Sequence, residues 1–379
     1  MLLACLSLLL CAAITASTHA QDSGQAPLLL DDGWEVAPPA EAGFDPVGLQ
    51  SLSGAIDSGA IRNIHAVLIE RDGRLVYERY LSGNDERWGD PIGVVQFDRD
   101  TLHDLRSVTK SVVSILLGIA LQHDFEAALR QSIVAYFPDL AGRFGSGMEA
   151  VTLQHVLTMT AGLQWNEMTV PYTDPRNDEI RLYQTGDPIG MVLGRPVISP
   201  PGIHWYYNGG LCQLVAGLVQ RRLGERLDAF AEERLFAPLG ITHYEWLGSR
   251  LWPSAESPSA ASGLRLRPRD LAKIGSLFAN GGRWQGRQIV PETWVALSTE
   301  RYVPRIPWSP DGTYGYGFFW YPGQIDGRRV IRAAGNGDQR LFILPELGVV
   351  VTVLAGNYND FEQESGERVL ALVLAALQP

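Results

Sequence analysis

Cysteine and lysine are nearly absent from this chain of 379 residues. Two of its three cysteines, Cys5 and Cys11, lie in the first apolar run. Once that run is removed, Cys212 alone remains, which excludes an internal disulfide and means that a packed core must stabilise the fold. Of 31 basic residues, only Lys110 and Lys273 are lysines. Arginine does not give up its proton in proteins whereas a buried lysine readily does, so a retained lysine suggests chemistry.

Other absences exclude classes of partner and of chemistry. The net charge of −11, with no basic run, argues against nucleic acid and anionic membranes as partners. The histidines are scattered without the paired spacing of a zinc site. We find no G-x-S-x-G, H-E-x-x-H, P-loop or G-x-G-x-x-G motif. We therefore expect no metal and no cofactor, and a small molecule or short peptide as substrate.

The first twenty residues are typical of a secretory signal peptide. An apolar run, Leu2 to Ile14, is followed by small and polar residues that end at Ala20. This run is too short to be a comfortable membrane anchor. We therefore expect cleavage after Ala20, no stable membrane anchor afterwards, and a secreted or periplasmic protein. Residues 21–42 are expected to form an N-terminal extension.

The rest of the chain has a globular composition, with 46% hydrophobic and 19% charged residues. Asp72-Gly73 between two apolar runs predicts a β-hairpin. Strands are predicted at residues 65–70, 74–81, 329–334, 339–344 and 349–355. Helices are predicted at residues 44–61, 105–117, 211–223, 227–235, 268–280 and 362–377. The segments between residues 82 and 104 and between 166 and 201 are expected to be mostly irregular.

Strand patterns thus lie near the two chain ends and helix patterns in the middle. This segregation predicts an α+β fold with an antiparallel sheet built from both ends and flanked by helices. We expect residues 43–120 and 265–379 to form the sheet domain. Residues 121–264 are expected to form an inserted, mostly helical domain that carries active-site loops, with a cleft between the two.

The segment LRSVTKSVVSILL brings a hydroxyl and an amine together. Ser107 and Lys110 stand at positions i and i+3, which are neighbours on one face of a helix. A serine attacks a carbonyl only when a base removes its proton, and a desolvated lysine can be that base. The alternative is a helix start in which Ser107 caps the first turn and Lys110 is a solvated charge.

Longer motifs carry a resemblance to a known family. They include RSVTKSVVSILLGIA, TLQHVLTMTAGLQW, PPGIHWYYNGG and AAGNGDQRLFILPELGVVVTV. In them the chain resembles the serine hydrolases of the class C β-lactamase and penicillin-binding protein superfamily, and especially their esterase and 6-aminohexanoate-dimer-hydrolase branch. The resemblance implies a β-lactamase/transpeptidase-like fold, with Ser107 of the S-x-x-K motif as nucleophile and Lys110 as proton acceptor.

The family's second element is a tyrosine that shares proton transfer with the lysine, usually within Y-x-N. Tyr206 satisfies this pattern literally, with Asn208 as the amide. The spacing from the Pro201-Gly202 turn instead selects Tyr207, which we prefer because that turn constrains the backbone. Asn208 is kept as an expected substrate contact. Tyr172 in PYTDP resembles a family loop over the active site and is expected to contact substrate as well.

The family's third element is usually K-T-G or H-x-G on a strand beside the serine. Here Gly335 stands in that place, where the missing side chain lets a carbonyl substrate approach. The N–H of the next residue, Asn336, and that of Ser107 are expected to form the oxyanion hole. A plain hairpin turn at Gly335 to Gly337 is the alternative.

Ala333 and Ala334 stand where the family carries a cation that holds the penicillin carboxylate. Their presence favours an esterase or amidase over a true β-lactamase. Arg332 or Arg340 can restore the positive charge, depending on strand direction. We therefore expect a serine hydrolase that cleaves an ester or amide through an acyl-enzyme. The alternatives are a penicillin- or peptide-recognising receptor with slow or no turnover, and a true β-lactamase or D-alanyl-D-alanine peptidase.

Overall fold

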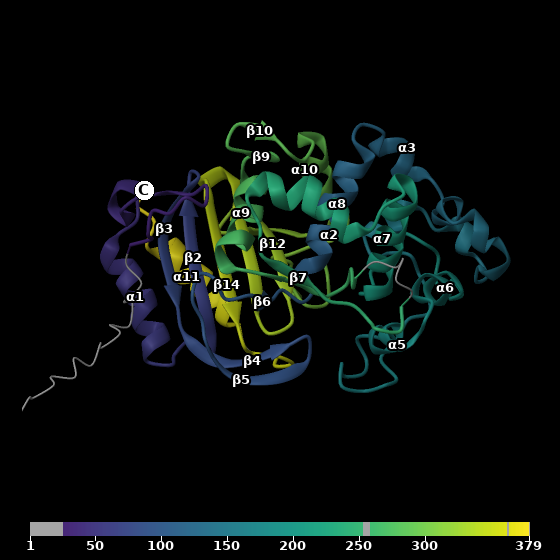
Figure 1. Ribbon diagram of the computed structural model, residues 1–379, viewed down its shortest axis with the longest axis horizontal. Coiled ribbons are helices and arrows are strands. Elements are labelled where there is room, and N and C mark those ends of the chain that lie inside the picture. Colours follow the sequence, from purple (N-terminus) through teal and green to yellow (C-terminus); the bar gives the residue numbers. More distant parts are fainter. Residues whose placement is uncertain (1–25, 253–257, 362–363, 379) are drawn as a thin grey trace, which may run out of the picture.

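A seven-stranded sheet built from both ends of the chain is the centre of the fold (Figure 1). The computed structural model describes residues 26–252, 258–361 and 364–378, so the expected signal peptide lies outside it. The strand order is β1-β3-β2-β14-β13-β12-β11. These strands are β1 (Glu35–Val36), β2 (Ile64–Arg71), β3 (Arg74–Tyr80), β11 (Tyr321–Ile325), β12 (Arg328–Gly335), β13 (Gln339–Leu344) and β14 (Val349–Ala355). The predicted sheet is confirmed.

All strand pairs in this sheet are antiparallel except that the edge strand β1 runs parallel to β3. The predicted hairpin joins β2 to β3. Its two turn residues, Asp72 and Gly73, have φ values of 52° and 80°. A two-residue turn with positive φ at both positions matches the right-handed twist of the strands, which is why Asp-Gly forms it.

Helices cover both faces of the sheet. The helices α1 (Pro46–Asp57) and α11 (Ser365–Ala375) pack together on one face, and α9 (Pro268–Ala279) lies across β2, β13 and β14 on the other (Figure 1). The helix α10 (Glu292–Ser298) contacts α2. Asp45 caps α1 by accepting hydrogen bonds from the N–H groups of Val47 and Gly48. These helices match the predicted segments except α10, which was not predicted.

A mostly helical region lies to the right of the sheet in Figure 1. It contains α3 (Phe125–Arg130), α4 (Leu153–Leu157), α5 (Asp178–Gln184), α6 (Pro188–Leu193), α7 (Gly209–Leu223) and α8 (Leu227–Ala231). The helix α2 (Val108–Leu121) packs against α7 on one side and contacts β12 and β13 on the other. It therefore connects the sheet with the helical region. The prediction of two separate domains stays a prediction.

Smaller sheets complete the chain. Three short strands, β6 (His103–Asp104), β8 (Leu264–Leu266) and β7 (Tyr244–Trp246), form one of them. Two hairpins are β4–β5 (Ser82–Arg87 and Asp90–Gln96) and β9–β10 (Arg283–Trp284 and Arg287–Gln288). The β4–β5 hairpin and the helices α5 and α6 correct the expectation of irregular segments.

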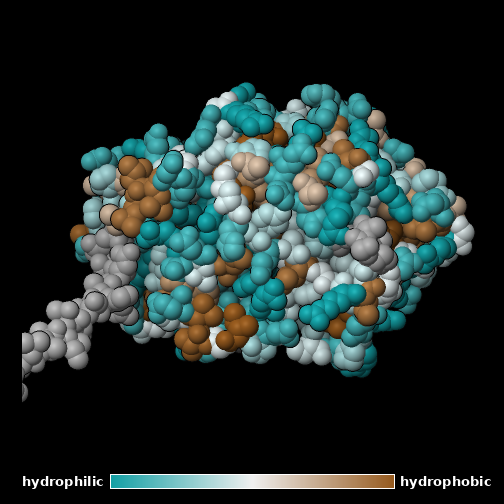
Figure 2. Space-filling view, in the orientation of Figure 1, coloured by the Kyte–Doolittle hydropathy of each residue, from teal (hydrophilic) through white to brown (hydrophobic). Residues whose placement is uncertain are grey.

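The β4–β5 hairpin has an exposed apolar side. Ile92 is 46% exposed and Val94 is 73% exposed, and apolar side chains gather over this hairpin at the lower edge of Figure 2. The alternation of apolar and polar residues that would have predicted these two strands is hard to see in the sequence, because the turn formers Asp, Asn and Gly fill much of the segment.

None of the described helices combines the length and the apolarity that a bilayer crossing requires.

Candidate active site

Ser107 and Lys110 meet at the first turn of α2. The Lys110 Nζ atom lies 3.0 Å from Ser107 Oγ and 2.7 Å from the carbonyl oxygen of Ala261. Ser107 faces a cavity, whereas Lys110 is only 2% exposed. Burial excludes the alternative of a solvated Lys110, and Ser107 makes no side-chain cap hydrogen bond. The two groups stand at the distance that proton transfer requires.

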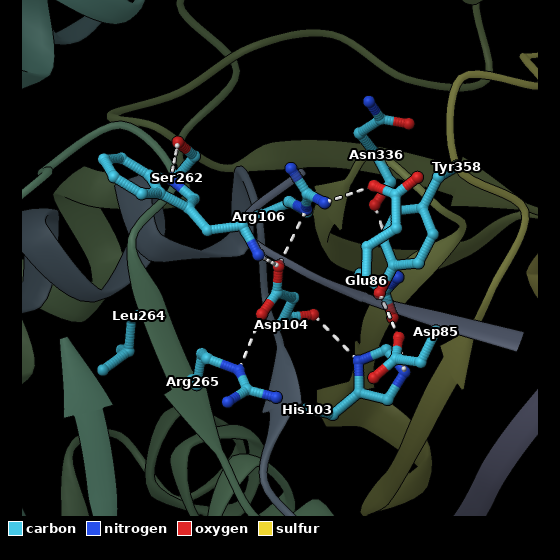
Figure 3. A network of polar contacts seen from close by, with 12 residues as sticks. Asp85, Glu86, His103, Asp104, Arg106, Ser262, Leu264, Arg265, Asn336 and Tyr358 are labelled. Carbon is cyan, nitrogen blue, oxygen red and sulfur yellow. Dashed lines mark hydrogen bonds and ion pairs between the residues drawn. The ribbon is translucent and has the colours of Figure 1, made fainter. Parts of the chain in front are cut away.

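A strained turn presents Ser107 to the cavity. Arg106 has a φ of 48°, which is uncommon for a residue other than glycine. Its guanidinium is held by Glu86 at 2.8 Å and by Asp104 at 3.2 Å, and Arg265 binds Asp104 at 2.7 Å (Figure 3). These ion pairs hold the residue before Ser107 in its strained conformation.

Gly335 and Asn336 lie beside this turn. A Cβ atom on Gly335 would stand 2.3 Å from the carbonyl oxygen of Leu105, so only glycine allows the strand to approach so closely. The Asn336 side chain is held by Asn359, because its amide group donates a hydrogen bond to Asn359 Oδ1 and its Oδ1 accepts one from the N–H of Asn359. Within the described chain, no hydrogen bond is found for the backbone N–H of either Ser107 or Asn336. Both N–H groups therefore stay available for an oxyanion.

Tyr207, and not Tyr206, lines the cavity with Ser107. The Lys110 Nζ atom lies 4.9 Å from the centre of the Tyr207 ring. Burial, with further contributions from neighbouring tyrosines and Glu167, raises the pKa of Tyr207 well above its ordinary value. Asn208 is the N-cap of α7, and its side chain accepts a hydrogen bond from the N–H of Leu211 at 3.3 Å. That side chain is 3% exposed and is absent from the cavity wall.

Two buried carboxyl groups lie behind Lys110. Glu179 Oε2 is 3.9 Å from Lys110 Nζ. Glu167 Oε2 accepts hydrogen bonds of 2.7 Å from the N–H of Gly209 and from the indole of Trp165. Glu167 Oε1 accepts one of 2.9 Å from Tyr172, whose ring lines the cavity. Tyr172 therefore links the cavity to the carboxyl pair.

The two carboxyl groups differ in pKa. Burial, the charge of Glu179 and a hydrogen bond to it raise the pKa of Glu167 well above its ordinary value. Burial alone would raise the pKa of Glu179, but Lys110 and three hydrogen bonds hold it below its ordinary value. The hydrogen bond between the two carboxyl groups itself needs a proton on one of them. The pair therefore carries one proton and one negative charge.

The sequence analysis missed both of these glutamates. Glu167 follows the TLQHVLTMTAGLQW motif by two positions, and Glu179 lies on α5, in a segment expected to be irregular. The sequence signal that could have found them is that Glu167 precedes and Glu179 follows Tyr172, which was expected to contact substrate. A contact with Lys110 across the fold, however, is not visible from spacing.

The cavity in front of Ser107 has a volume of about 950 Å³. It runs from Ser107 along β12 to the inner side of α11. Gly335 and Asn336 form part of its wall. Its aromatic lining residues are Tyr172, Tyr207, Trp308, Tyr314, Tyr321 and Phe361. The structure thus brings all the expected site residues except Asn208 to the cavity or, for Lys110, directly behind it.

The strand register separates the two alanines of the third element. Ala333 is fully buried in the core, and only Ala334 lines the cavity. Of the two alanines, only Ala334 therefore contributes to the cavity wall. Arg332 and Arg340 both reach the cavity wall, but each is paired with a carboxylate. Neither is a free cation at this wall.

The second lysine is a structural residue. Lys273 on α9 is 1% exposed and lies 3.1 Å from Asp270 one helical turn away. Both lysines of the chain are therefore buried, and Lys273 has an acidic partner that balances its charge. The two lysines that the sequence retains thus mark two buried positions, but only Lys110 lies beside a serine hydroxyl.

Two of the scattered histidines do meet in the core. His65 Nδ1 and His103 Nε2 are 2.8 Å apart, and Asp85 lies beside them. Tetrahedral zinc bonds of about 2.05 Å would place two nitrogens roughly 3.3 Å apart, so this separation is that of a hydrogen bond. Burial is the main cause that lowers the pKa of His65 to about 3 and that of His103 to about 4. Both rings are therefore neutral near pH 7.

Comparisons with known proteins agree with this architecture. A family model described as Beta-lactamase matches residues 58–375. Lovastatin esterase of Penicillium rubens is 26% identical over 258 residues, which cover 61% of this chain and 59% of the esterase. The 6-aminohexanoate-dimer hydrolase of Paenarthrobacter ureafaciens is 23% identical over 323 residues, which cover 76% of this chain and 72% of the hydrolase.

Solved structures share the fold. A family VIII carboxylesterase superposes with a TM-score of 0.67 at 17% identity, covering 90% of this chain and 99% of the carboxylesterase. The chain spans between half and three fifths of the length of the first curated relatives that it matches, with 59% of one and 52% of the next. The expected β-lactamase/transpeptidase-like fold is confirmed.

Proposed function

The chain belongs to the beta-lactamase family, and on that premise we propose that it is a serine hydrolase that cleaves an ester or amide bond of a small molecule through an acyl-enzyme on Ser107. Family relatives include an esterase and an amide-bond hydrolase. The observation that carries the proposal is the 3.0 Å contact between Ser107 Oγ and Lys110 Nζ beside a large cavity.

Acylation begins with proton transfer from Ser107. The neutral amine of Lys110 accepts the hydroxyl proton while Ser107 Oγ attacks the carbonyl carbon of the substrate. The N–H groups of Ser107 and Asn336 donate hydrogen bonds to the oxyanion that forms. The ammonium on Lys110 then lies 3.9 Å from Glu179, whose negative charge stabilises it.

The leaving group needs a proton when its bond to the carbonyl carbon breaks. Tyr207 stays protonated because burial raises the pKa of its phenol. It therefore acts as a proton donor and relay between Lys110 and the leaving group rather than as the initial base. In the second half of the reaction, water attacks the acyl-enzyme, Lys110 accepts a proton from that water, and Ser107 regains its hydroxyl.

Two other functions fit the same fold. A receptor for penicillins or peptides would form the acyl-enzyme and release it slowly or not at all. A true β-lactamase or D-alanyl-D-alanine peptidase would need to hold a substrate carboxylate. Ala334 in place of a cation, with Arg332 and Arg340 already paired, argues against this second alternative. We also propose that the protein is secreted or periplasmic, on the signal-peptide pattern of residues 1–20.

Turnover of p-nitrophenyl butyrate separates a hydrolase from a receptor. We expect continued release of nitrophenol over many equivalents of enzyme, and none from Ser107→Ala. A single stoichiometric burst from the wild type would identify a receptor. Equal continued release from Ser107→Ala would refute the acyl-enzyme at Ser107.

A further inference from the structure

Four charged side chains form a cluster in the cavity wall on the far side from Lys110. Arg332 donates a hydrogen bond of 2.6 Å from Nη1 to Glu367 Oε1. Arg340 lies 3.6 Å from the same oxygen through Nε and 2.8 Å from Asp338 Oδ1 through Nη2. All four residues line the cavity into which Ser107 opens. Two positive charges are thus balanced by two negative charges.

The members of this cluster differ in what fixes them. The Arg332 guanidinium stacks over the Tyr314 ring at 3.8 Å, and its side chain is 10% exposed. Asp338 is 1% exposed and also accepts a hydrogen bond from the N–H of Gly366, so it ties the β12–β13 turn to the start of α11. Glu367 is the most exposed of the four, at 25%. Of the four charges in the cluster, that of Glu367 is therefore the most accessible to an entering substrate.

The rest of the wall does not add cations. Its other charged residues are the acidic Asp311, Asp360 and Glu364. Beyond the cluster the cavity ends on Ile325, Leu370, Ala371 and Leu374, which are apolar or small. An acyl chain that leaves Ser107 in this direction first passes the balanced cluster and then meets apolar side chains. A carboxylate on that chain would find both arginines occupied and would be repelled by Glu367.

We propose that Glu367 determines the specificity of this site by neutralising Arg332 beside the Arg340–Asp338 pair, so that the cavity accepts an uncharged acyl group and rejects one that bears a carboxylate. This inference rests on the proposed serine hydrolase. Removing the charge of Glu367 leaves the cluster with one net positive charge, held at Arg332. That charge would bind a carboxylate at the far end of an acyl chain through charge-assisted hydrogen bonds.

The experiment compares two substrates of equal chain length, p-nitrophenyl pentanoate and mono-p-nitrophenyl glutarate. They differ by a carboxylate in place of the terminal methyl group. We expect the wild type to prefer the pentanoate in kcat/KM by about tenfold or more. In Glu367→Gln this preference should fall by about tenfold or more, mainly through a lower KM for the glutarate. Glutamine keeps an acceptor oxygen for Arg332, so the fold is preserved.

Glu364→Gln is the matched control. Glu364 lines the same cavity and carries the same charge, but it is not among the partners described for Arg332 or Arg340. Its variant should keep the wild-type preference. In the double variant Arg332→Gln/Glu367→Gln, the gain for the glutarate should disappear. An unchanged preference in Glu367→Gln, or an equal change in Glu364→Gln, would overturn the proposal.

A binding measurement keeps this inference separate from the proposed function. In a Ser107→Ala background, the nitrophenyl group of each ester should quench the emission of Trp308, which lines the cavity. The ratio of the two dissociation constants should change with Glu367→Gln and not with Glu364→Gln. Wild-type protein that hydrolyses neither ester would refute the hydrolase, whereas equal dissociation-constant ratios in all three backgrounds would refute the role of Glu367.

Discussion

Replacing Glu179 by glutamine tests how the buried carboxyl pair acts on Lys110. Glu179 Oε2 lies 3.9 Å from Lys110 Nζ, and both side chains are nearly excluded from solvent. At an effective dielectric constant of about 20, two unit charges at this separation attract each other by about 4 kcal/mol. That energy is an upper value and corresponds to a factor of up to about 10³ in a rate constant.

The predicted effect is a lower rate of acylation. Without the negative charge of Glu179, the ammonium that forms on Lys110 during acylation loses its counterion, so kcat/KM should fall by roughly tenfold to 10³-fold. Tyr172, Tyr183 and Tyr207 face the same groups, but burial raises the pKa of each well above its ordinary value, so none of them supplies a negative charge in its place.

Glu167→Gln is the matched control for this prediction. Burial beside Glu179 raises the pKa of Glu167, so its carboxyl is already neutral in the pair. Glutamine keeps the acceptor oxygen and removes no charge. The assay is kcat/KM for p-nitrophenyl butyrate between pH 5 and 9, with melting temperatures for both variants. An unchanged kcat/KM in Glu179→Gln, or equal losses in the two variants, would refute the reasoning.

Three other predictions follow from single residues. Lys110→Arg should lower kcat/KM by about 100-fold or more, nearly as much as Lys110→Ala, because arginine keeps the charge but cannot accept a proton. Substantial activity in the arginine variant would reduce Lys110 to an electrostatic role. Nitrocefin should be hydrolysed far more slowly than p-nitrophenyl acetate, since Ala334 replaces the cation; nitrocefin kinetics like those of an efficient β-lactamase would contradict this. Burial raises the pKa of Glu70 to about 8. Between the lower pKa of Glu70 in the unfolded chain and this value, the unfolded chain has lost a proton that the folded protein keeps. The free energy of unfolding of the wild type therefore falls as pH rises through this range. Urea unfolding should show Glu70→Gln gaining about 1.4 kcal/mol over wild type for each pH unit between about 5.5 and 7, and a constant difference would be the contrary result.

Local rules predicted much of the sheet. The bounds of β13 and β14 match the predicted strands, because fully buried strands are continuous apolar runs between turn residues. The β2–β3 hairpin followed from Asp72-Gly73, where the turn chemistry lies within two residues. Ser107 and Lys110 were paired correctly in space because a helix places positions i and i+3 on one face.

Long-range contacts were not predictable in the same way. Glu179 reaches Lys110 from a helix 69 positions later, and no local pattern connects them. The inward direction of Ala334 rather than Ala333 depends on the strand register, since a shift of one residue reverses every side chain. The contact of Glu367 with Arg332 and Arg340 was also hidden, because Glu367 comes from α11, far along the chain. Spacing therefore located the contact between Ser107 and Lys110, but not the charged groups that surround it.

The most direct test of the acyl-enzyme at Ser107 is covalent labelling with a fluorophosphonate, followed by mass spectrometry of the intact protein and of its peptides. The proposed mechanism predicts one adduct per chain, located at Ser107, that is lost in Ser107→Ala while the melting temperature stays unchanged. An adduct on another residue, or one that persists in Ser107→Ala, would contradict it.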